Sequence, residues 1–174
     1  MQQTILAIGA LLIIMTTAML YQRSNMLTQE LAYIRQIEIA AEDAARTKLE
    51  GLATLAFDES IVVSSSIEPD PNTFTAAASF GLDAGESYPS IVDDVDDYHG
   101  IKDTIWQSIS VNADSFRFVV DYSVQYITTT GIVTTTPTNQ KELIVEIESL
   151  DRIGTRQVKG TFTKLTSVND NLTP

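Results

Sequence analysis

Residues 4–20 read TILAIGALLIIMTTAML, a run of 17 residues without a charged side chain. As an α-helix this run would rise roughly 26 Å, which is near the lower limit for crossing a bilayer. No Lys or Arg precedes it, whereas a cleaved signal peptide has a basic start. We therefore expect residues 1–25 to form a retained apolar helix that spans a membrane, packs with other copies, or does both in turn.

The helical pattern continues beyond Arg23 with a change of character. Apolar side chains recur there at three- and four-residue steps, which is typical of an amphipathic helix. The residues of this stripe are Leu27, Leu31, Ile34, Ala41, Ala45, Leu49, Leu52 and Leu55. The first proline is Pro69, so we expect one helix over about residues 3–57, in which residues 26–58 are the amphipathic continuation.

Residues 59–174 have the pattern of a small β-domain. The stretch SFRFVVDYSVQYIT, residues 115–128, alternates apolar and mostly polar side chains, as a half-buried strand does. Leu143, Val145 and Ile147 alternate with glutamates in a second strand, and residues 157–165, QVKGTFTKL, form a weaker third one. We expect an antiparallel meander over residues 115–166, and a short strand is conceivable at residues 60–65.

Together these patterns predict an α+β fold. A long N-terminal helix, apolar and then amphipathic, packs on a small antiparallel sheet of three to four strands. Three strands with one apolar face are marginal alone, and the helix supplies the cover that they need.

Charge and composition exclude several functions. The net charge is −12, and residues 59–110 carry ten acidic side chains against one basic one. Such a surface repels phosphate backbones, so we expect no nucleic-acid binding. The chain has no cysteine, no nucleophile elbow and no phosphate-binding glycine loop, and we expect neither an enzyme nor a small-molecule substrate.

An acidic loop spans residues 83–103. Four carboxylates fall within five residues at its centre: Asp93, Asp94, Asp96 and Asp97. Oxygen ligands of this kind suit calcium, although the spacing and the glutamate of an EF-hand are missing. We expect instead a solvated turn with carboxylates of ordinary pKa that caps a helix at residues 98–105, and calcium is the alternative.

Three other features have plainer interpretations. His99 is the only histidine, and we expect it to be a surface or hydrogen-bonded side chain, not a metal ligand. Trp106 is expected to anchor the core at the entry to the sheet. The threonine-rich segment 128–138 is expected to be an exposed hairpin loop.

Two local strings resemble parts of known filament subunits. LEGLATLAFDES, residues 49–60, is similar to the end of the long helix in minor pilins of the mannose-sensitive haemagglutinin type. DDVDDYHG, residues 93–100, is similar to an acidic loop of the same proteins. The predicted architecture also resembles that of type IV pilins and pseudopilins. The glycine-ended leader and the fifth-position glutamate of those families have no counterpart in the opening MQQTI, so neither is carried over.

The resemblance implies a structural subunit of a prokaryotic pilus-like filament on the cell surface. The subunit would be held in the inner membrane before assembly, and its partners would be that membrane and other copies of itself. The expected contacts in the filament core are Ile5, Leu6, Ile8, Leu11, Leu12, Ile13, Ile14, Met15, Leu20, Leu27 and Leu31. The alternative is a single-span anchored binding or scaffold protein that does not polymerise.

Overall fold

The computed structural model describes residues 2–64, 70–108, 115–151 and 157–168. The chain divides into two units, residues 1–37 and residues 38–174, which are described separately. Helix α1, Gln2–Leu52, forms all of the described part of the first unit and enters the second. It ends about five residues earlier than the sequence pattern predicts, because the chain turns at Ala53–Leu55, where Leu55 N–H donates to Leu52 O.

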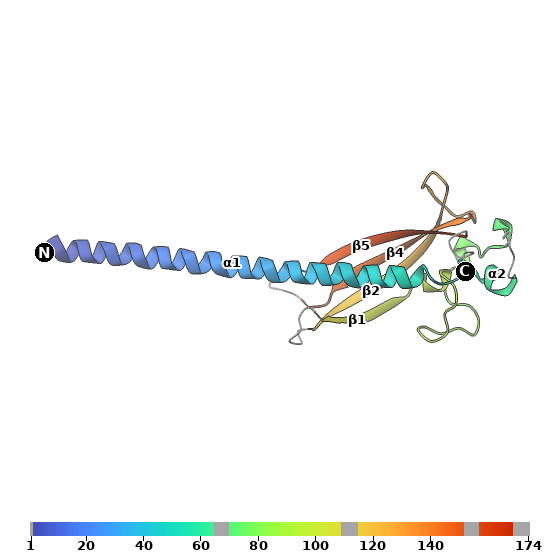
Figure 1. Ribbon diagram of the computed structural model, residues 1–174, viewed down its shortest axis with the longest axis horizontal. Coiled ribbons are helices and arrows are strands. Elements are labelled where there is room, and N and C mark those ends of the chain that lie inside the picture. Colours follow the sequence, from blue (N-terminus) through green and yellow to red (C-terminus); the bar gives the residue numbers. More distant parts are fainter. Residues whose placement is uncertain (1, 65–69, 109–114, 152–156, 169–174) are drawn as a thin grey trace. The chain divides into compact units, whose positions relative to one another are not determined.

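The second unit contains an antiparallel sheet of five strands (Figure 1). The α+β arrangement expected from the sequence is confirmed, with more strands than the expected three to four. Strand order is β1-β2-β4-β5, and the short β3 pairs with β2. The strands are β1 (Lys102–Ser108), β2 (Ser115–Ile127), β3 (Val133–Thr134), β4 (Gln140–Ser149) and β5 (Lys159–Ser167).

Strand β1 is the element that the sequence pattern mispredicts. The expected helix at residues 98–105 is wrong: a 3-10 turn at Asp96–Tyr98 leads into a strand instead. Lys102 and Asp103 obscure the strand signal, because β1 is an edge strand with no fully buried side chain. Its charged side chains form ion pairs. Lys102 pairs with Asp121 on β2, and Lys48 of α1 lies 3.5 Å from Asp103.

The short strand considered for residues 60–65 is also a wrong prediction. Residue 65 lies outside the described residues, and the rest of this stretch is not a strand. Glu59–Ser64 form a short helix, α2. Asp58 precedes this helix, and its carboxylate accepts hydrogen bonds from the backbone N–H and the hydroxyl of Ser60. A carboxylate in that position satisfies a free N–H of the first helical turn, which favours a helix start over a strand.

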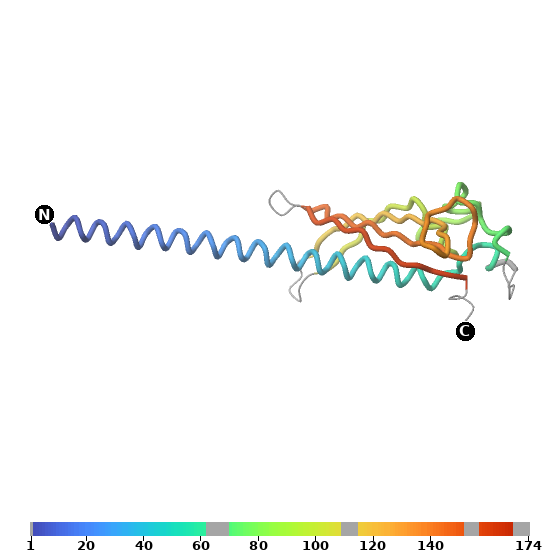
Figure 2. Tube along the Cα trace, turned by 90° about the horizontal axis from the view of Figure 1, so that it is seen from above, coloured from blue at the N-terminus to red at the C-terminus, as the bar shows by residue number. Residues whose placement is uncertain are grey.

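The core of the second unit lies between one face of the sheet and the distal part of α1 (Figures 1 and 2). The alternating inward side chains of β2 and β4, such as Phe118, Val120 and Val145, are completely buried. The helix covers them largely with small side chains, which permit a close approach. The buried residues of α1 in this unit are Ala40, Ala41, Ala44, Ala45, Leu49 and Leu52.

Because the helix and sheet approach closely, we expect a larger side chain at the fully buried Ala45 to destabilise the fold. We expect Ala45→Leu to lower the free energy of unfolding by about 1–3 kcal/mol, because added methyl groups force neighbouring side chains out of place. Denaturant unfolding of the full chain in detergent measures the effect. The control Thr47→Leu, at an exposed position of the same helix, should stay within about 0.5 kcal/mol of the wild type. Equal losses in both variants would contradict the packing described here.

Candidate functional site

The apolar segment of α1 presents its side chains outward on all sides of the helix. All the residues expected to form the assembly core are 52–73% exposed in the structure. Met19, Tyr21 and Met26 add to this surface, with exposures of 75%, 69% and 70%. A continuous apolar surface of this size requires a covering of lipid or protein.

Two polar side chains within the segment form hydrogen bonds with the backbone of the helix itself. The Thr16 hydroxyl donates to Leu12 O at 3.0 Å, and the Thr17 hydroxyl donates to Ile13 O at 2.9 Å. Such back-bonding hides a hydroxyl from an apolar surrounding. By its length and composition, α1 is able to span a membrane.

The acidic loop folds inward, contrary to the expected solvated turn. Asp94, Asp96 and Asp97 are buried, and only Asp93 among the four aspartates is exposed. Asp94 organises the turn, because its Oδ1 accepts the backbone N–H groups of Asp96 and Asp97 at 2.9 and 3.2 Å. The four carboxylates therefore do not form a single cage.

Beneath this loop lies a buried cation that the sequence reasoning missed. Lys141 on β4 has no exposed side-chain surface, and its Nζ lies 2.5 Å from Asp96 Oδ1 and 3.2 Å from Asp58 Oδ2. The same nitrogen donates to the backbone O of Phe57 at 2.5 Å. The signal was present in the sequence, because position 141 continues the inward series of Leu143, Val145 and Ile147.

Burial alters the proton affinity of the loop carboxyls. It raises the pKa of Asp94 to about 8, with a further contribution from the charge of Asp96, and also raises the pKa of Asp96. Burial and a hydrogen bond with Glu86 raise the pKa of Asp97 to about 7. The expectation of ordinary pKa values is wrong for Asp94, Asp96 and Asp97, since it assumed exposure to solvent.

Three carboxylates do converge at the outer side of the loop. Oxygen atoms of Glu86, Asp93 and Asp97 lie within 4.8 Å of one another, which is close enough for the three to hold a metal ion together. Calcium stays a prediction for the loop, with Glu86 joining Asp93 and Asp97, while Asp94 and Asp96 face inward.

His99 and Trp106 have different outcomes. His99 Nδ1 accepts the backbone N–H of Val124 at 3.1 Å, so the expected hydrogen-bonded histidine is confirmed. Trp106 is 65% exposed on the outer face of β1, and the prediction of a core anchor is wrong. The guanidinium of Arg117, on the neighbouring strand, lies 5.6 Å from the centre of its ring.

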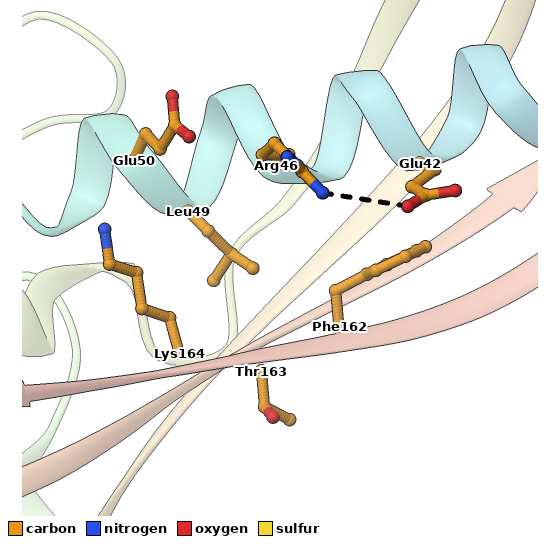
Figure 3. Close-up of a pocket in the computed structure, with 7 residues that line it drawn as sticks. All are labelled: Glu42, Arg46, Leu49, Glu50, Phe162, Thr163 and Lys164. Carbon is orange, nitrogen blue, oxygen red and sulfur yellow. Dashed lines mark ion pairs between the residues drawn. The ribbon is translucent and has the colours of Figure 1, made fainter.

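A groove of about 290 Å³ lies between α1 and the edge strand β5 (Figure 3). Leu49 and Phe162 point into it from the two elements, while Thr163 points away. Charged side chains surround it, including an ion pair in which Arg46 and Glu42 lie 3.8 Å apart. The threonine-rich segment 128–138 is mostly exposed, as expected.

No family model, curated protein or solved structure matches this chain.

The raised pKa values predict a pH dependence of stability. A folded-state pKa of about 7 for Asp97, against about 3.8 in an unfolded chain, means that the folded state holds this proton more tightly. The stabilising contribution is complete below about pH 4 and is lost as the pH rises through about 7. We expect Asp97→Asn to remove part of the loss between pH 4 and 7, measured by denaturant unfolding across that range. Asp43→Asn, at an exposed helix position, is the control, and identical pH profiles for the wild type and Asp97→Asn would contradict the burial of this carboxyl.

The predicted calcium site has a direct test in the melting temperature. Bound calcium would raise the melting temperature at millimolar concentration, because a ligand that binds only the folded state stabilises it. The rise should disappear in Asp93→Asn and Glu86→Gln, which each remove one converging carboxylate. It should persist in Asp43→Asn, and an unchanged melting temperature in the wild type would exclude the ion.

Proposed function

We propose that this chain is a subunit of a pilus-like cell-surface filament, in which the apolar helical segments of many copies pack together in the core. The observation that carries the proposal is the continuity of α1 from Gln2 to Leu52. One helix holds an apolar surface that needs a covering and also forms one layer of the folded second unit. A filament core built from the apolar part of α1 would therefore be joined to the β-domain by the helix itself, without an intervening linker.

Two residues beyond the charge-free run support packing between copies. Leu27 and Leu31 lie after Arg23 and are 52% and 58% exposed. A membrane helix formed by residues 4–20 does not require large apolar side chains there, because the flanks of a membrane span are polar or interfacial. Packing against neighbouring helices accounts for them directly.

Assembly of identical subunits through unlike surfaces produces an open helical polymer when the contacts do not close into a ring. Before assembly the same segment would hold the subunit in a membrane. The net charge of −12 is compatible with a solvated outer surface, and it disfavours nucleic acid as a partner.

Electron microscopy tests the proposal. We expect filaments from the full chain after detergent removal and none from a chain lacking residues 1–25. Monodisperse particles of the full chain under all conditions would instead support the single-span anchored protein.

Substitutions beyond the membrane segment separate the two functions more sharply. We expect Leu27→Glu and Leu31→Glu together to abolish filaments while leaving membrane insertion intact, because these residues lie outside the charge-free run. Thr28→Glu, an exposed neighbour, is the control for added charge. Filament yield by microscopy and membrane retention by flotation are the measurements, and normal filaments from the double variant would contradict packing through these leucines.

A further inference from the structure

Lys141 lies in an apolar enclosure, and two carboxyl groups are within hydrogen-bonding distance of its Nζ. Its side chain has no exposed surface, and its Nζ lies 4.6, 5.1 and 5.3 Å from the ring centres of Phe57, Phe80 and Tyr126. The neighbouring oxygens belong to segments far apart in sequence, since Asp58 and Asp96 are 83 and 45 residues from Lys141. Bulk water is therefore excluded from the Lys141 side chain and from the carboxyl groups of Asp58 and Asp96, which the fold holds together.

The two carboxyl groups are held differently. Asp58 accepts hydrogen bonds from Ser60 through one oxygen, and from Thr75 N–H at 2.9 Å and Tyr126 Oη at 3.3 Å through the other. These hydrogen bonds hold the Asp58 carboxyl group in place, with its Oδ2 3.2 Å from Lys141 Nζ. Asp96 Oδ1 instead lies 2.5 Å from Lys141 Nζ, which is the shorter of the two contacts between this nitrogen and a carboxyl group.

This arrangement brings together the groups that a condensation needs. A protonated carboxyl group is the electrophile, a neighbouring carboxylate accepts the proton of the ammonium, and the freed amine is the nucleophile. Holding these groups in contact replaces an encounter between separate molecules, which is a large kinetic advantage. The enclosure also keeps water away from the product.

We propose that Nζ of Lys141 and the carboxyl carbon of Asp96 form an intramolecular amide bond, with Asp58 as the proton-transfer group. The Lys141 ammonium gives one proton to the Asp58 carboxylate, and the free amine attacks the carboxyl carbon of Asp96. The C–N bond forms and the C–OH bond breaks. Asp58 passes its proton to the leaving hydroxyl and receives one from the attacking nitrogen, so the products are an amide, one water molecule and protonated Asp58. No oxidant, reductant or activated co-reactant is needed.

The bond would connect the turn at Asp96–Tyr98 to the central strand β4. It would close a loop of the size that a disulfide closes in other proteins, and this chain has no cysteine with which to make one. Such a cross-link stabilises chiefly by limiting the freedom of the unfolded chain.

The intact mass of the full chain under denaturing conditions tests the proposal. Lys141→Arg keeps the positive charge but cannot form this bond. The mass difference between the wild type and Lys141→Arg should exceed the difference between the two residues by one water molecule. This comparison is unaffected by any processing at the chain ends that both proteins share. A difference equal to that of the residues alone would overturn the proposal.

Peptide mapping of the wild type gives a second, independent readout. Digestion with trypsin and with a protease that cleaves after acidic residues separates Asp58 from Asp96. We expect one linked peptide containing Lys141 and Asp96, and no trypsin cleavage after Lys141. Separate, unlinked peptides, or a link from Lys141 to Asp58, would overturn the assignment even if the variants failed to fold.

The role of Asp58 is tested with Asp58→Asn, which keeps the shape of the side chain but cannot accept the proton. We expect its folded form, checked by near-ultraviolet circular dichroism, to lack the linked peptide. Asp43→Asn, at an exposed position far from Lys141 in sequence, is the matched control and should retain the link. Full linkage in Asp58→Asn would contradict the proton-transfer role.

Discussion

The second unit depends on the placement of one lysine side chain in its interior. Lys141 faces inward from β4 and draws to itself the segment after α1, through Phe57 and Asp58, and the acidic loop, through Asp96. Before the proposed amide bond forms, removing one partner of this buried ion pair would cost about 3–5 kcal/mol, because the remaining charge is left without compensation. The segment after α1 and the acidic loop, which belong to no strand of the sheet, are therefore both fixed to the sheet through one side chain. The inward folding of the acidic loop follows from that arrangement, since Asp96 reaches Lys141 only when the loop turns toward the sheet.

The fold was predictable where one periodicity dominates. The unbroken helical pattern gives α1, and the alternation in β2 and β4 gives the central strands, because each pattern reflects one face buried against one layer. The prediction fails at β1, where an edge position leaves the strand half-exposed and its charges resemble those of a loop. It fails again at Glu59–Ser64, where a local hydrogen bond from Ser60 to Asp58 outweighs the β-propensity of Ile61, Val62 and Val63.

The candidate site was predictable only in part, and for a physical reason. The apolar surface of α1 is a property of consecutive residues, so composition alone locates it. The environment of the four aspartates depends on Lys141, which lies more than forty residues away, and no local pattern connects them. Asp94, Asp96 and Asp97 look like a hydrated cluster in sequence, yet they are buried because a cation and two backbone N–H groups are supplied from within the fold. Only the phase of the alternation in β4 placed that cation inside.

The hydroxyl groups of Thr16 and Thr17 have a consequence for any subunit that leaves one surrounding for another. Both bond to carbonyl groups of their own helix, so neither requires a partner from lipid or from a neighbouring chain. A transfer from a bilayer to a bundle of helices would then exchange one set of dispersion contacts for another, with no hydrogen bond broken at these positions. The helix would be able to move between the two phases at little enthalpic cost, and shape complementarity with its neighbours would decide where it rests.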